Sequence, residues 1–405
     1  MARGRGEREE GVVVVVEKHL GLLKLVKILS VVLVFVAGVV IGLGTTSHVN
    51  LYFRRQADLY FYADNVSAAA APTPSVPSEV NCILKESDCE TVNCLSMDRF
   101  IKPVSLKHSL SDSELSWRAS MEPRVKHYPF ARVPKVAFMF LTRGPLPLLP
   151  LWERFFEGQN RDLFTIYVHA NPGFDLNVSS SSVFYGRQVQ SQIVEWGTAS
   201  LTDAEKRLLA NALLDFSNER FVLLSESCIP IHNFPTVYKY LIHSKYSFAD
   251  SFDEPTRYGR GRYNRKMLPD IHLRQWRKGS QWFELDRFLA ISIISDTKYY
   301  EIFKKYCRPA CYPDEHYIPT FLNMFHGSQN ANRSVTWVDW SLGGPHPATY
   351  ENFNITEGFI RRIQNNETLC SYNSEKTSLC YLFARKFAPS ALEPLLNLTS
   401  TVLRF

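Results

Sequence analysis

The stretch KVAFMFLTRGPLPLLPLWERFF, residues 135–156, decides the fold of this 405-residue chain. Its apolar run at 136–141 has the length of a buried strand, and after a proline-rich loop the residues 148–156 have the pattern of a helix. The same alternation continues downstream, with strands expected at 164–169, 192–196 and 221–224 and helices at 202–216 and 235–242. Strands that alternate with helices predict an α/β fold, in which a mostly parallel sheet has helices on both faces.

The second half of the chain is less regular. We expect an extended segment at 247–251 and helices at 297–306 and 314–325, although Pro319 interrupts the last of these. Two pairs of residues have the spacing of a capping box, which marks the start of a helix: Thr202 with Glu205, and Ser390 with Glu393 near the C-terminus.

The ends of the predicted strands carry polar residues. In open parallel sheets, ligands bind beyond the carboxyl ends of the strands. Those ends are Leu141-Thr142-Arg143, His169-Ala170-Asn171 and Ser225-Glu226-Ser227. Thr142, His169 and Asn171 are therefore candidates for ligand binding.

An N-terminal stretch has the composition of a membrane span. No charged residue occurs from Ile28 to Leu43, and the stretch 28–46 has 19 residues, close to the roughly 20 that cross a bilayer core. Six basic residues precede it, so the positive-inside rule places the N-terminus in the cytosol and the bulk of the chain in the lumen. A cleaved signal peptide and a buried core helix are the competing interpretations.

Cysteines and sequons agree with this topology. All eight cysteines follow the span, as expected in an oxidising compartment. Six N-x-[ST] sequons also follow it, at Asn65, Asn177, Asn332, Asn354, Asn366 and Asn397. The predicted organisation is a cytosolic tail at 1–27, a transmembrane signal-anchor helix at 28–46, a lumenal stem at 47–97 and a lumenal domain at 98–405, with its core at 135–390.

Several motifs are absent from the sequence. It contains no G-x-S-x-G elbow, no Walker A motif and no G-x-G-x-x-G. It also lacks D-x-D, which would supply carboxylates to a divalent ion that bridges a nucleotide diphosphate. We therefore expect no metal cofactor.

The net charge of the chain says little about its partners. At +6 it is weak evidence for a polyanion partner, and the predicted lumenal topology argues against nucleic acid.

Three clusters each allow two interpretations. Asp314 and Glu315 at a helix start either stabilise the helix N-terminus or act in catalysis. Cys307-x3-Cys311 with His316 could bind zinc, but in an oxidising lumen disulfides are favoured, and Cys370 and Cys380 are plausible partners. The basic stretch Arg257–Lys266 is either a solvated loop or a loop that faces an anion or a sugar.

Taken together, the motifs resemble the plant core-2/I-branching β-1,6-N-acetylglucosaminyltransferase-like family. The resemblance covers about residues 135–390. The segments that carry it are KVAFMFLTRGPLPLLPLWERFF, IYVHANPGF, VEWGTASLTDAEKRLLANAL, FVLLSESCIPI, RKGSQWFELDR, CYPDEHYIPTF, VDWSLGGPHP and LFARKF.

The resemblance implies a type II Golgi membrane glycosyltransferase with a GT-A-like fold. Such an enzyme inverts the anomeric centre and transfers a sugar, for which N-acetylglucosamine is one candidate, from a UDP-sugar to a glycan or glycoprotein without a metal. The general base in the P-D-E segment of the family's animal members falls on Glu315. Their diphosphate-binding residues fall on Lys386 and on Arg361, with Arg362 as an alternative.

One position departs from the family pattern. Relatives contact the nucleoside through His-x-Asp, whereas this chain has His169-Ala170-Asn171, in which an amide replaces the carboxylate. For the acceptor, the candidates are Asp253, Glu254, Trp282 and Tyr317.

Two other functions compete with the transferase. One is a non-catalytic lumenal carbohydrate-binding or scaffold protein on the same fold, because a fold does not fix an activity. The other is an anchored hydrolase that uses paired carboxylates. Asp314 and Glu315 are adjacent and would point apart on a helix, which disfavours the hydrolase.

Overall fold

The computed structural model describes residues 97–405, apart from residues 126, 309 and 366–368. The predicted tail, membrane span and stem up to residue 96, together with the sequons at Asn65 and Asn366, lie outside the described residues. Within the described part of the chain, no helix combines the length and apolar character needed to cross a membrane.

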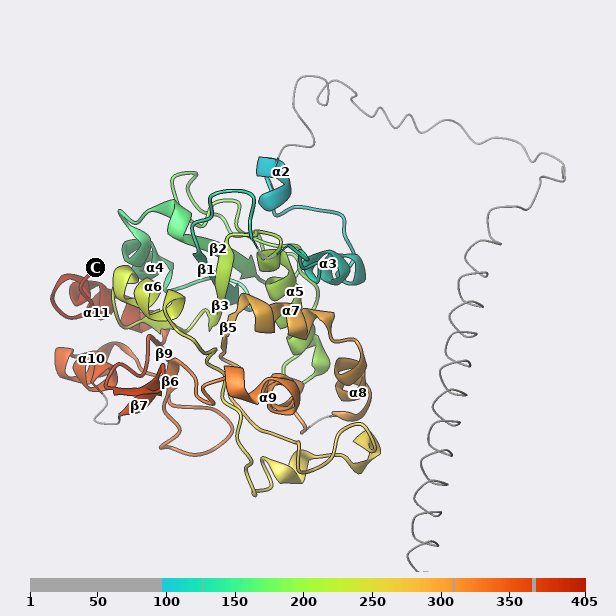
Figure 1. Cartoon of the computed structure of the whole chain (residues 1–405). Coiled ribbons are helices and arrows are strands. Elements are labelled where there is room, and N and C mark those ends of the chain that lie inside the picture. The colour runs from blue at the N-terminus through green and yellow to red at the C-terminus, as the bar shows by residue number, and fades with distance from the viewer. Residues whose placement is uncertain (1–96, 126, 309, 366–368) are drawn as a thin grey trace, which may run out of the picture. The chain divides into compact units, whose positions relative to one another are not determined.

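A four-stranded sheet forms the centre of the domain, in the order β2-β1-β3-β5 (Figure 1). Strands β1 (Lys135–Leu141), β2 (Phe164–His169) and β3 (Asn218–Ser225) are parallel, whereas β5 (Glu284–Asp286) is antiparallel to β3. Every residue of β1 is buried, because a strand with a neighbour on each side and helices on both faces has no exposed surface. The mostly parallel sheet predicted from the sequence is confirmed.

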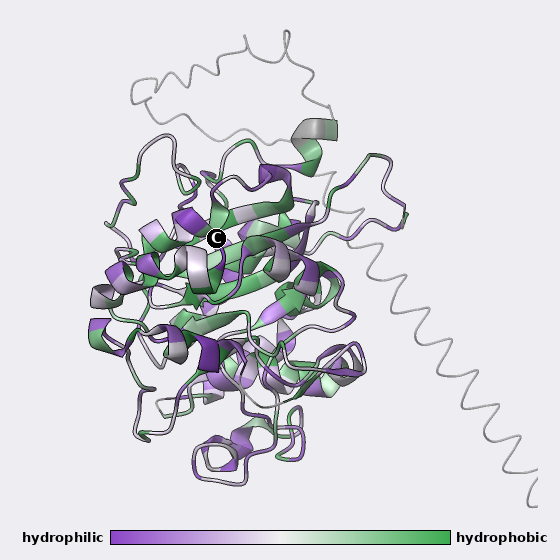
Figure 2. Ribbon diagram, turned by 90° about the vertical axis from the view of Figure 1, so that its left-hand side faces the viewer, coloured by the Kyte–Doolittle hydropathy of each residue, from purple (hydrophilic) through white to green (hydrophobic). Residues whose placement is uncertain are grey.

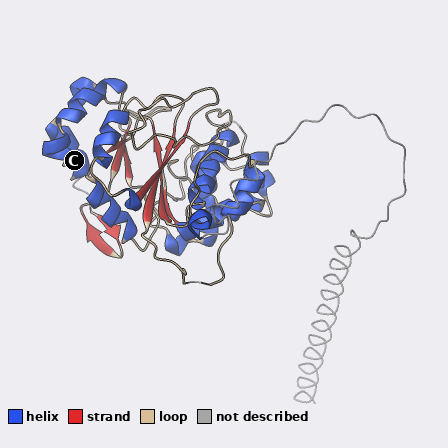
Figure 3. Ribbon diagram, turned by 90° about the horizontal axis from the view of Figure 1, so that it is seen from above, coloured by secondary structure: helices blue, strands red, loops and turns tan. Residues whose placement is uncertain are grey.

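Helices cover both faces of this sheet (Figure 3). The core on one face includes residues of α5 (Ala199–Leu213), α7 (Arg287–Ser295), α8 (Lys298–Tyr306) and α9 (Pro313–Phe325), and α3 (Asp112–Ala119) packs beside α5. The core on the other face includes residues of α4 (Leu149–Phe156), α6 (Phe234–Ile242), α10 (Glu357–Gln364) and α11 (Leu392–Asn397). A short helix, α2 (Met97–Ile101), begins the described chain. Figure 2 shows the apolar residues gathered along the strands and on the inward helix faces.

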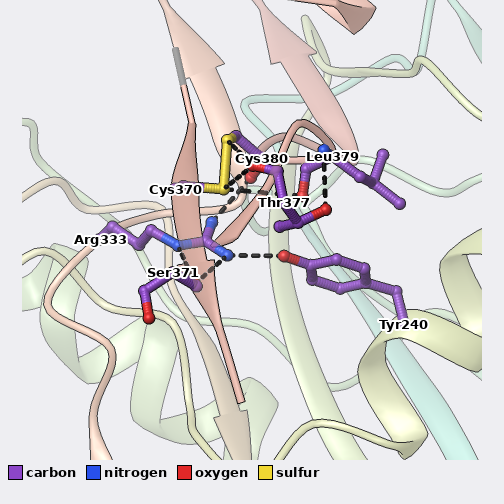
Figure 4. The surroundings of a disulfide bond; sticks show 7 residues. All are labelled: Tyr240, Arg333, Cys370, Ser371, Thr377, Leu379 and Cys380. Carbon is purple, nitrogen blue, oxygen red and sulfur yellow. Dashed lines mark hydrogen bonds between the residues drawn. A yellow bond between two sulfur atoms is a disulfide. The ribbon is translucent and has the colours of Figure 1, made fainter. Parts of the chain in front are cut away.

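Smaller sheets extend the domain toward the C-terminus. Strands β4 (Ile229–Pro230), β9 (Phe383–Arg385) and β6 (Thr336–Val338) form a three-stranded sheet, and β7 (Cys370–Tyr372) pairs with β8 (Glu375–Thr377) in a hairpin. A disulfide joins Cys370 at the start of this hairpin to Cys380 just beyond it (Figure 4). The guanidinium of Arg333 donates to the Ser371 and Cys380 carbonyls and to the Tyr240 hydroxyl, and these bonds tie the hairpin to α6.

A second disulfide joins Cys307 and Cys311. The zinc interpretation of these residues is therefore wrong, since a disulfide leaves no thiolate to bind a metal. His316 lies elsewhere in the packing: its ring stacks on Trp276 at 4.6 Å, and its Nδ1 is 2.8 Å from the carbonyl of Arg277. Among the described residues, no group of three or more His, Cys, Asp or Glu side chains is arranged to hold a metal ion.

One predicted strand is absent from the structure, and one strand of the structure was not predicted. Residues 192–196 form an irregular segment rather than a strand, and the side chains of Ile193 and Trp196 are 75% and 57% exposed. The fourth strand of the sheet is instead β5, which the sequence pattern did not reveal because it has only three residues and two are acidic. Glu284 is nevertheless fully buried, since Arg220 on β3 donates to both of its carboxylate oxygens at 2.6 and 2.7 Å.

Both predicted capping boxes are absent. Helix α5 begins earlier than predicted, with Thr198 as its N-cap, so Thr202 and Glu205 lie inside the helix and are fully buried. At the C-terminus, a 3₁₀ turn (Pro389–Ala391) precedes α11, and the residue at its N-cap is Ala391. Pro319 does not end α9, which continues to Phe325.

Candidate active site

A cavity of about 370 Å³ lies at the carboxyl-terminal edge of the parallel strands. Thr142 follows β1, Asn171 follows β2, and Glu226 follows β3, and all three line the cavity. This is the position that the general rule for open α/β sheets predicts for a ligand. The loop before β5 and the first turn of α9 complete the walls, through Lys278, Gln281, Trp282 and Glu315 among others.

Positive charge is concentrated on one side of the cavity. Arg143, Arg385 and Lys386 line it together with one carboxylate, Glu226. Burial lowers the pKa of Lys386, and the neighbouring Arg385 and Arg143 lower it further, whereas Glu226 acts in the opposite direction. The guanidinium of Arg385 lies 4.0 Å from the centre of the Trp282 ring, which fixes its plane. Three cations that repel one another favour a bound anion with several oxygens.

Glu315 also lines the cavity, in the first turn of α9. Its Oε2 accepts a hydrogen bond from Arg262 Nη1 at 2.6 Å, and its side chain is 27% exposed. The same guanidinium lies 4.3 Å from the centre of the Tyr312 ring. Tyr312 has a left-handed backbone conformation with φ of 56°, which is uncommon for a residue with a side chain. The carboxylate therefore reaches the cavity in a fixed orientation.

The backbone of Glu315 is held by a contact that depends on Pro319. In an α-helix, the carbonyl of residue 315 would accept a hydrogen bond from the N–H of residue 319, but proline has no N–H. The Glu315 carbonyl instead accepts from Gly279 N at 2.8 Å. Gly279 lines the cavity, so this bond connects the cavity loop to the helix that carries Glu315.

Only a glycine fits at position 279. A Cβ atom there would lie 2.0 Å from the carbonyl oxygen of Asp250 and 2.8 Å from Cγ of Pro319. Residues Phe252 and Lys278 exchange two backbone hydrogen bonds at 2.9 Å beside this point. Two loops and α9 therefore meet at one residue that has no side chain.

Asp314 also lines the cavity, although only 7% of its surface is exposed to solvent. Burial raises the pKa of Asp314 to about 7, and the adjacent Glu315 raises it as well, whereas Arg262 lowers it. The neighbouring carboxylates of Asp314 and Glu315 thus differ in their surroundings: one is enclosed, and the other faces the cavity and a guanidinium.

Aromatic side chains form the outer rim of the cavity. Trp196 and Trp340 line it and are 57% and 52% exposed. The Trp196 ring lies 5.1 Å from the Tyr312 ring and 5.5 Å from the His346 ring. Exposed aromatic rings around a polar cavity suit a ligand that has both apolar faces and polar edges.

The structure brings five of the predicted site residues to this cavity. Glu315, Lys386, Thr142, Asn171 and Trp282 all line it. Asp253 and Glu254 lie in the adjoining loop, where Asp253 pairs with Arg260 and Glu254 pairs with Lys278 at 3.3 Å.

Three predicted residues lie elsewhere. His169 is fully buried behind the cavity, with its Nε2 2.9 Å from Arg207 Nη1. Tyr317 is fully buried, and its hydroxyl donates to Asp296 at 2.8 Å. Arg361 is on α10, where it pairs with Glu357 at 2.7 Å and lines a separate cavity of about 180 Å³ with Arg404. The apolar face of α10 is buried in the core, which leaves Arg361 away from the strand ends.

Several lining residues were not assigned from the sequence. Arg143 and Glu226 lie two residues after the ends of predicted strands, and Arg385 precedes Lys386, so these positions could have indicated a role at the site. Trp340 and His346 come from an irregular loop in the VDWSLGGPHP segment, which carried the family resemblance but indicated no role for either residue. The predicted sequons at Asn177, Asn332 and Asn397 are exposed, whereas Asn354 is half-buried and accepts a hydrogen bond from Glu351 N.

Comparison with known proteins adds an independent finding. Residues 136–364 match the family described as Branch: Core-2/I-Branching enzyme. The chain is also 38% identical over 310 residues to a rice (Oryza sativa subsp. japonica) protein named Glycosyltransferase BC10, an alignment that covers 65% of this chain and 76% of the rice protein. The matched region includes β1 and the ends of all the central strands, the cavity loop and α9.

We predict that Gly279→Ala destabilises the protein, because the new Cβ would collide with the Asp250 carbonyl. The free energy of unfolding should fall by about 1–3 kcal/mol, as in other overpacked sites, in urea denaturation followed by circular dichroism. Gly358→Ala on α10 is the matched control, since a Cβ there meets nothing within 4 Å. Equal stability of the two variants would show that the loop adapts without cost.

Proposed function

Because the chain belongs to the Core-2/I-branching enzyme family and is a glycosyltransferase, we propose that it transfers a sugar from a UDP-sugar to a hydroxyl of a glycan or glycoprotein. We propose an inverting reaction in which the acceptor oxygen attacks the anomeric carbon in line with the departing UDP. N-acetylglucosamine is one candidate for the transferred sugar. The observation that carries this proposal is that Glu315 and the cations Arg143, Arg385 and Lys386 line one cavity.

Glu315 is the proposed general base. An inverting transfer needs one base that takes the proton of the acceptor hydroxyl while the new bond forms. The side chain lines the cavity, retains exposure and has one oxygen, Oε2, bound by Arg262. The other oxygen has no hydrogen bond to the described residues and can accept the hydroxyl proton.

Lys386, Arg385 and Arg143 are the proposed binding site for the donor diphosphate. The departing UDP gains negative charge in the transition state, and fixed positive groups beside it lower the barrier. We assign to Arg385 the diphosphate-binding role that the sequence had suggested for Arg361, because Arg385 is adjacent to Lys386 and lines the same cavity. Thr142 and Asn171, at the ends of β1 and β2, are the proposed contacts of the nucleoside.

The remaining walls are proposed to bind the acceptor. Trp282 and Phe252 line the cavity, as does Lys278, which pairs with Glu254. Trp196 and Trp340 at the rim supply flat surfaces on which a pyranose ring can stack. We therefore expect an acceptor that presents sugar rings rather than an extended peptide alone.

We also propose that the protein is a single-pass type II Golgi membrane protein with its catalytic domain in the lumen. The supporting observations are the uncharged N-terminal stretch with its preceding basic residues, and the two disulfides of the described domain.

Glu315→Gln tests the proposed base, because an amide keeps the shape of the side chain but cannot accept the proton. Turnover of the UDP-sugar with acceptor should fall by about 10²–10⁴-fold, while UDP affinity persists. Glu357→Gln, at an exposed ion pair on α10, is the matched control. Near-normal turnover of a folded Glu315→Gln variant would exclude the catalytic role, and the role of Glu315 would then be to stabilise the helix N-terminus.

Lys386→Ala tests the proposed diphosphate site. This substitution should weaken UDP binding by about 10- to 100-fold, the equivalent of one charged hydrogen bond, whereas Lys376→Ala on the exposed β8 should leave UDP binding unchanged.

Chelation tests the proposed independence from metal. Metal independence is expected because the sequence lacks a D-x-D motif and because cations line the cavity. Turnover should be the same with and without EDTA, because side chains rather than an ion neutralise the diphosphate. Loss of activity on chelation and its recovery with manganese would show that the donor is bound through a metal.

Glycosidase treatment tests the proposed topology. Because Asn177, Asn332 and Asn397 are exposed and lie in sequons, a lumenal domain should carry N-glycans. Removal of N-glycans should increase the electrophoretic mobility of the protein, and the C-terminus should be protected from protease in sealed vesicles. An unglycosylated protein with a cleavable C-terminus would place the domain in the cytosol.

A further inference from the structure

A second cavity, of about 180 Å³, shares no lining residue with the candidate active site. Three segments line it: the start of α6 at 232–236, the end of α10 at 361–365, and the C-terminal segment 402–404. Two arginines, Arg361 and Arg404, are among the lining residues, and none of the described residues that line this cavity is acidic. The second cavity therefore carries positive charge with no carboxylate on its walls.

Both guanidinium groups retain N–H donors that no protein group uses. Arg361 Nε donates to Glu357 Oε1 at 2.7 Å, which offsets part of its charge, but its two Nη groups have no hydrogen-bond partner among the described residues. The Arg404 side chain forms neither a hydrogen bond nor an ion pair with the described part of the chain. A guanidinium holds its N–H groups in a planar fork that fits the oxygens of an oxyanion. Two such groups on one small cavity favour an oxyanion as its ligand.

His232 adds an acceptor to the same cavity. Its Nε2 is shielded from solvent and has no hydrogen-bond partner, whereas the ring does bond to the backbone of Tyr381. The Tyr381 bond therefore uses Nδ1, so that Nδ1 carries the proton and Nε2 is left as an acceptor. Burial lowers the pKa of His232 to about 4; the Tyr381 bond acts in the opposite direction, and Arg404 lowers the pKa further. The ring is thus neutral at neutral pH and lacks a donor for Nε2.

The walls of the second cavity are held together by Gln364. This side chain is 9% exposed, and its Nε2 donates to the carbonyl of Ile231 at 2.5 Å and to the carbonyl of Val402 at 3.2 Å. One residue of α10 therefore binds both of the other segments that line the cavity. A ligand would find the site already formed, which lowers the entropic cost of binding.

We propose that this second cavity binds a hydrogen phosphate ion, whose oxygens accept hydrogen bonds from Arg361 and Arg404 while its O–H donates to His232 Nε2. The two negative charges of the ion match the two arginines. The cavity is smaller than the pockets that hold drug-sized ligands, so one small ion can contact several of its walls.

The unpartnered acceptor decides between ions of similar shape. Sulfate is a tetrahedral dianion like hydrogen phosphate but has no O–H, and the fully ionised phosphate group of an ester has none either. Neither provides a donor for His232 Nε2, and a buried acceptor without a donor is costly. The free ion therefore fits the cavity better than sulfate or a phosphate that is part of a sugar.

This site is distinct from the proposed diphosphate site. The paired strands β4 and β9 separate the two. At one end of the pair, Ile231 N donates to the carbonyl of Leu382 at 3.0 Å, next to His232. At the other end, Phe387 N donates to the carbonyl of Ser227 at 3.0 Å, next to Lys386. The inference therefore goes beyond the proposed transfer reaction and does not rest on it.

A comparison of phosphate with sulfate tests the acceptor. Full-length Lys386→Ala protein is used, because this variant lacks one cation of the other cavity, and each ion is titrated by calorimetry at about pH 8, where both are dianions. Phosphate should bind about 3- to 10-fold more tightly than sulfate, the equivalent of one neutral hydrogen bond. His232→Phe in the same protein should abolish this preference. Equal affinities for the two ions before that substitution would overturn the proposal.

Arg404→Gln locates the site. In the same Lys386→Ala protein, loss of this charge should weaken phosphate binding by about 10- to 100-fold, as for one charged hydrogen bond. Arg362→Gln is the matched control, because Arg362 is exposed on α10 and lines neither cavity. Equal phosphate affinities of the Arg404→Gln and Arg362→Gln proteins would overturn the proposal.

The source of the phosphate is tested with glucose 6-phosphate, which should bind no more tightly than sulfate at about pH 8, because its phosphate group then has no O–H. Tighter binding of glucose 6-phosphate than of phosphate would overturn the assignment to the free ion.

Hydrogen exchange of the wild type keeps the proposal testable if the variants do not fold. Phosphate should slow amide exchange in the segments 231–242 and 399–405, and absence of this protection would overturn the proposal. A wild type without transferase activity would contradict the proposed function but would leave the outcome of these binding experiments unchanged.

Discussion

The arrangement of the candidate site depends on one backbone hydrogen bond, from Gly279 N–H to the carbonyl of Glu315. This bond forms because Pro319 cannot donate to that carbonyl, and because Gly279 has no Cβ to hold the two backbones apart. A proline within a helix usually costs stability, since it leaves a carbonyl without its helical partner. Here the free carbonyl joins α9 to the cavity loop, and the cost of the proline is offset by a contact that holds the first turn of α9, with Glu315, against that loop.

The sheet supplies the other half of the arrangement. Parallel strands end at the same edge, so Thr142, Asn171 and Glu226 come together although they are far apart in sequence. The small sheet of β4, β9 and β6 then brings Lys386 to this edge, since it directly follows β9. Arg143 and Arg385 both repel the charge of Lys386 along the cavity. The fold thus stores unfavourable electrostatic energy that a polyanionic ligand would relieve.

The sequence predicted the parts of the fold that local patterns determine. The strands at 136–141, 164–169 and 221–224 are long apolar runs, and the structure has all three. The strand β5 could not be predicted, because its burial of Glu284 depends on Arg220 from a distant strand. The same limit applies to the site. Glu315 and Lys386 stand in recognisable motifs and line the cavity, whereas Arg361 was assigned from the family resemblance, and only tertiary packing shows that α10 directs it elsewhere.

Helix α5 is an example in which the sequence pattern gives the wrong expectation for the burial of charged side chains. Its consecutive residues Glu205, Lys206 and Arg207 read as a solvated face, yet all three are buried. Lys206 donates to the carbonyls of Ile293 and Asp296, and Arg207 makes two hydrogen bonds to Asp112 on α3. Burial lowers the pKa of Lys206 to about 8. Buried charges contribute little net stability even when well paired, because desolvation cancels most of the attraction. Their contribution is to orientation, because the three side chains bind different neighbours: Glu205 accepts from Gln281, Lys206 donates to carbonyls at and beyond α7, and Arg207 binds Asp112 on α3. These contacts together fix how α5 packs against α3, α7 and the cavity loop.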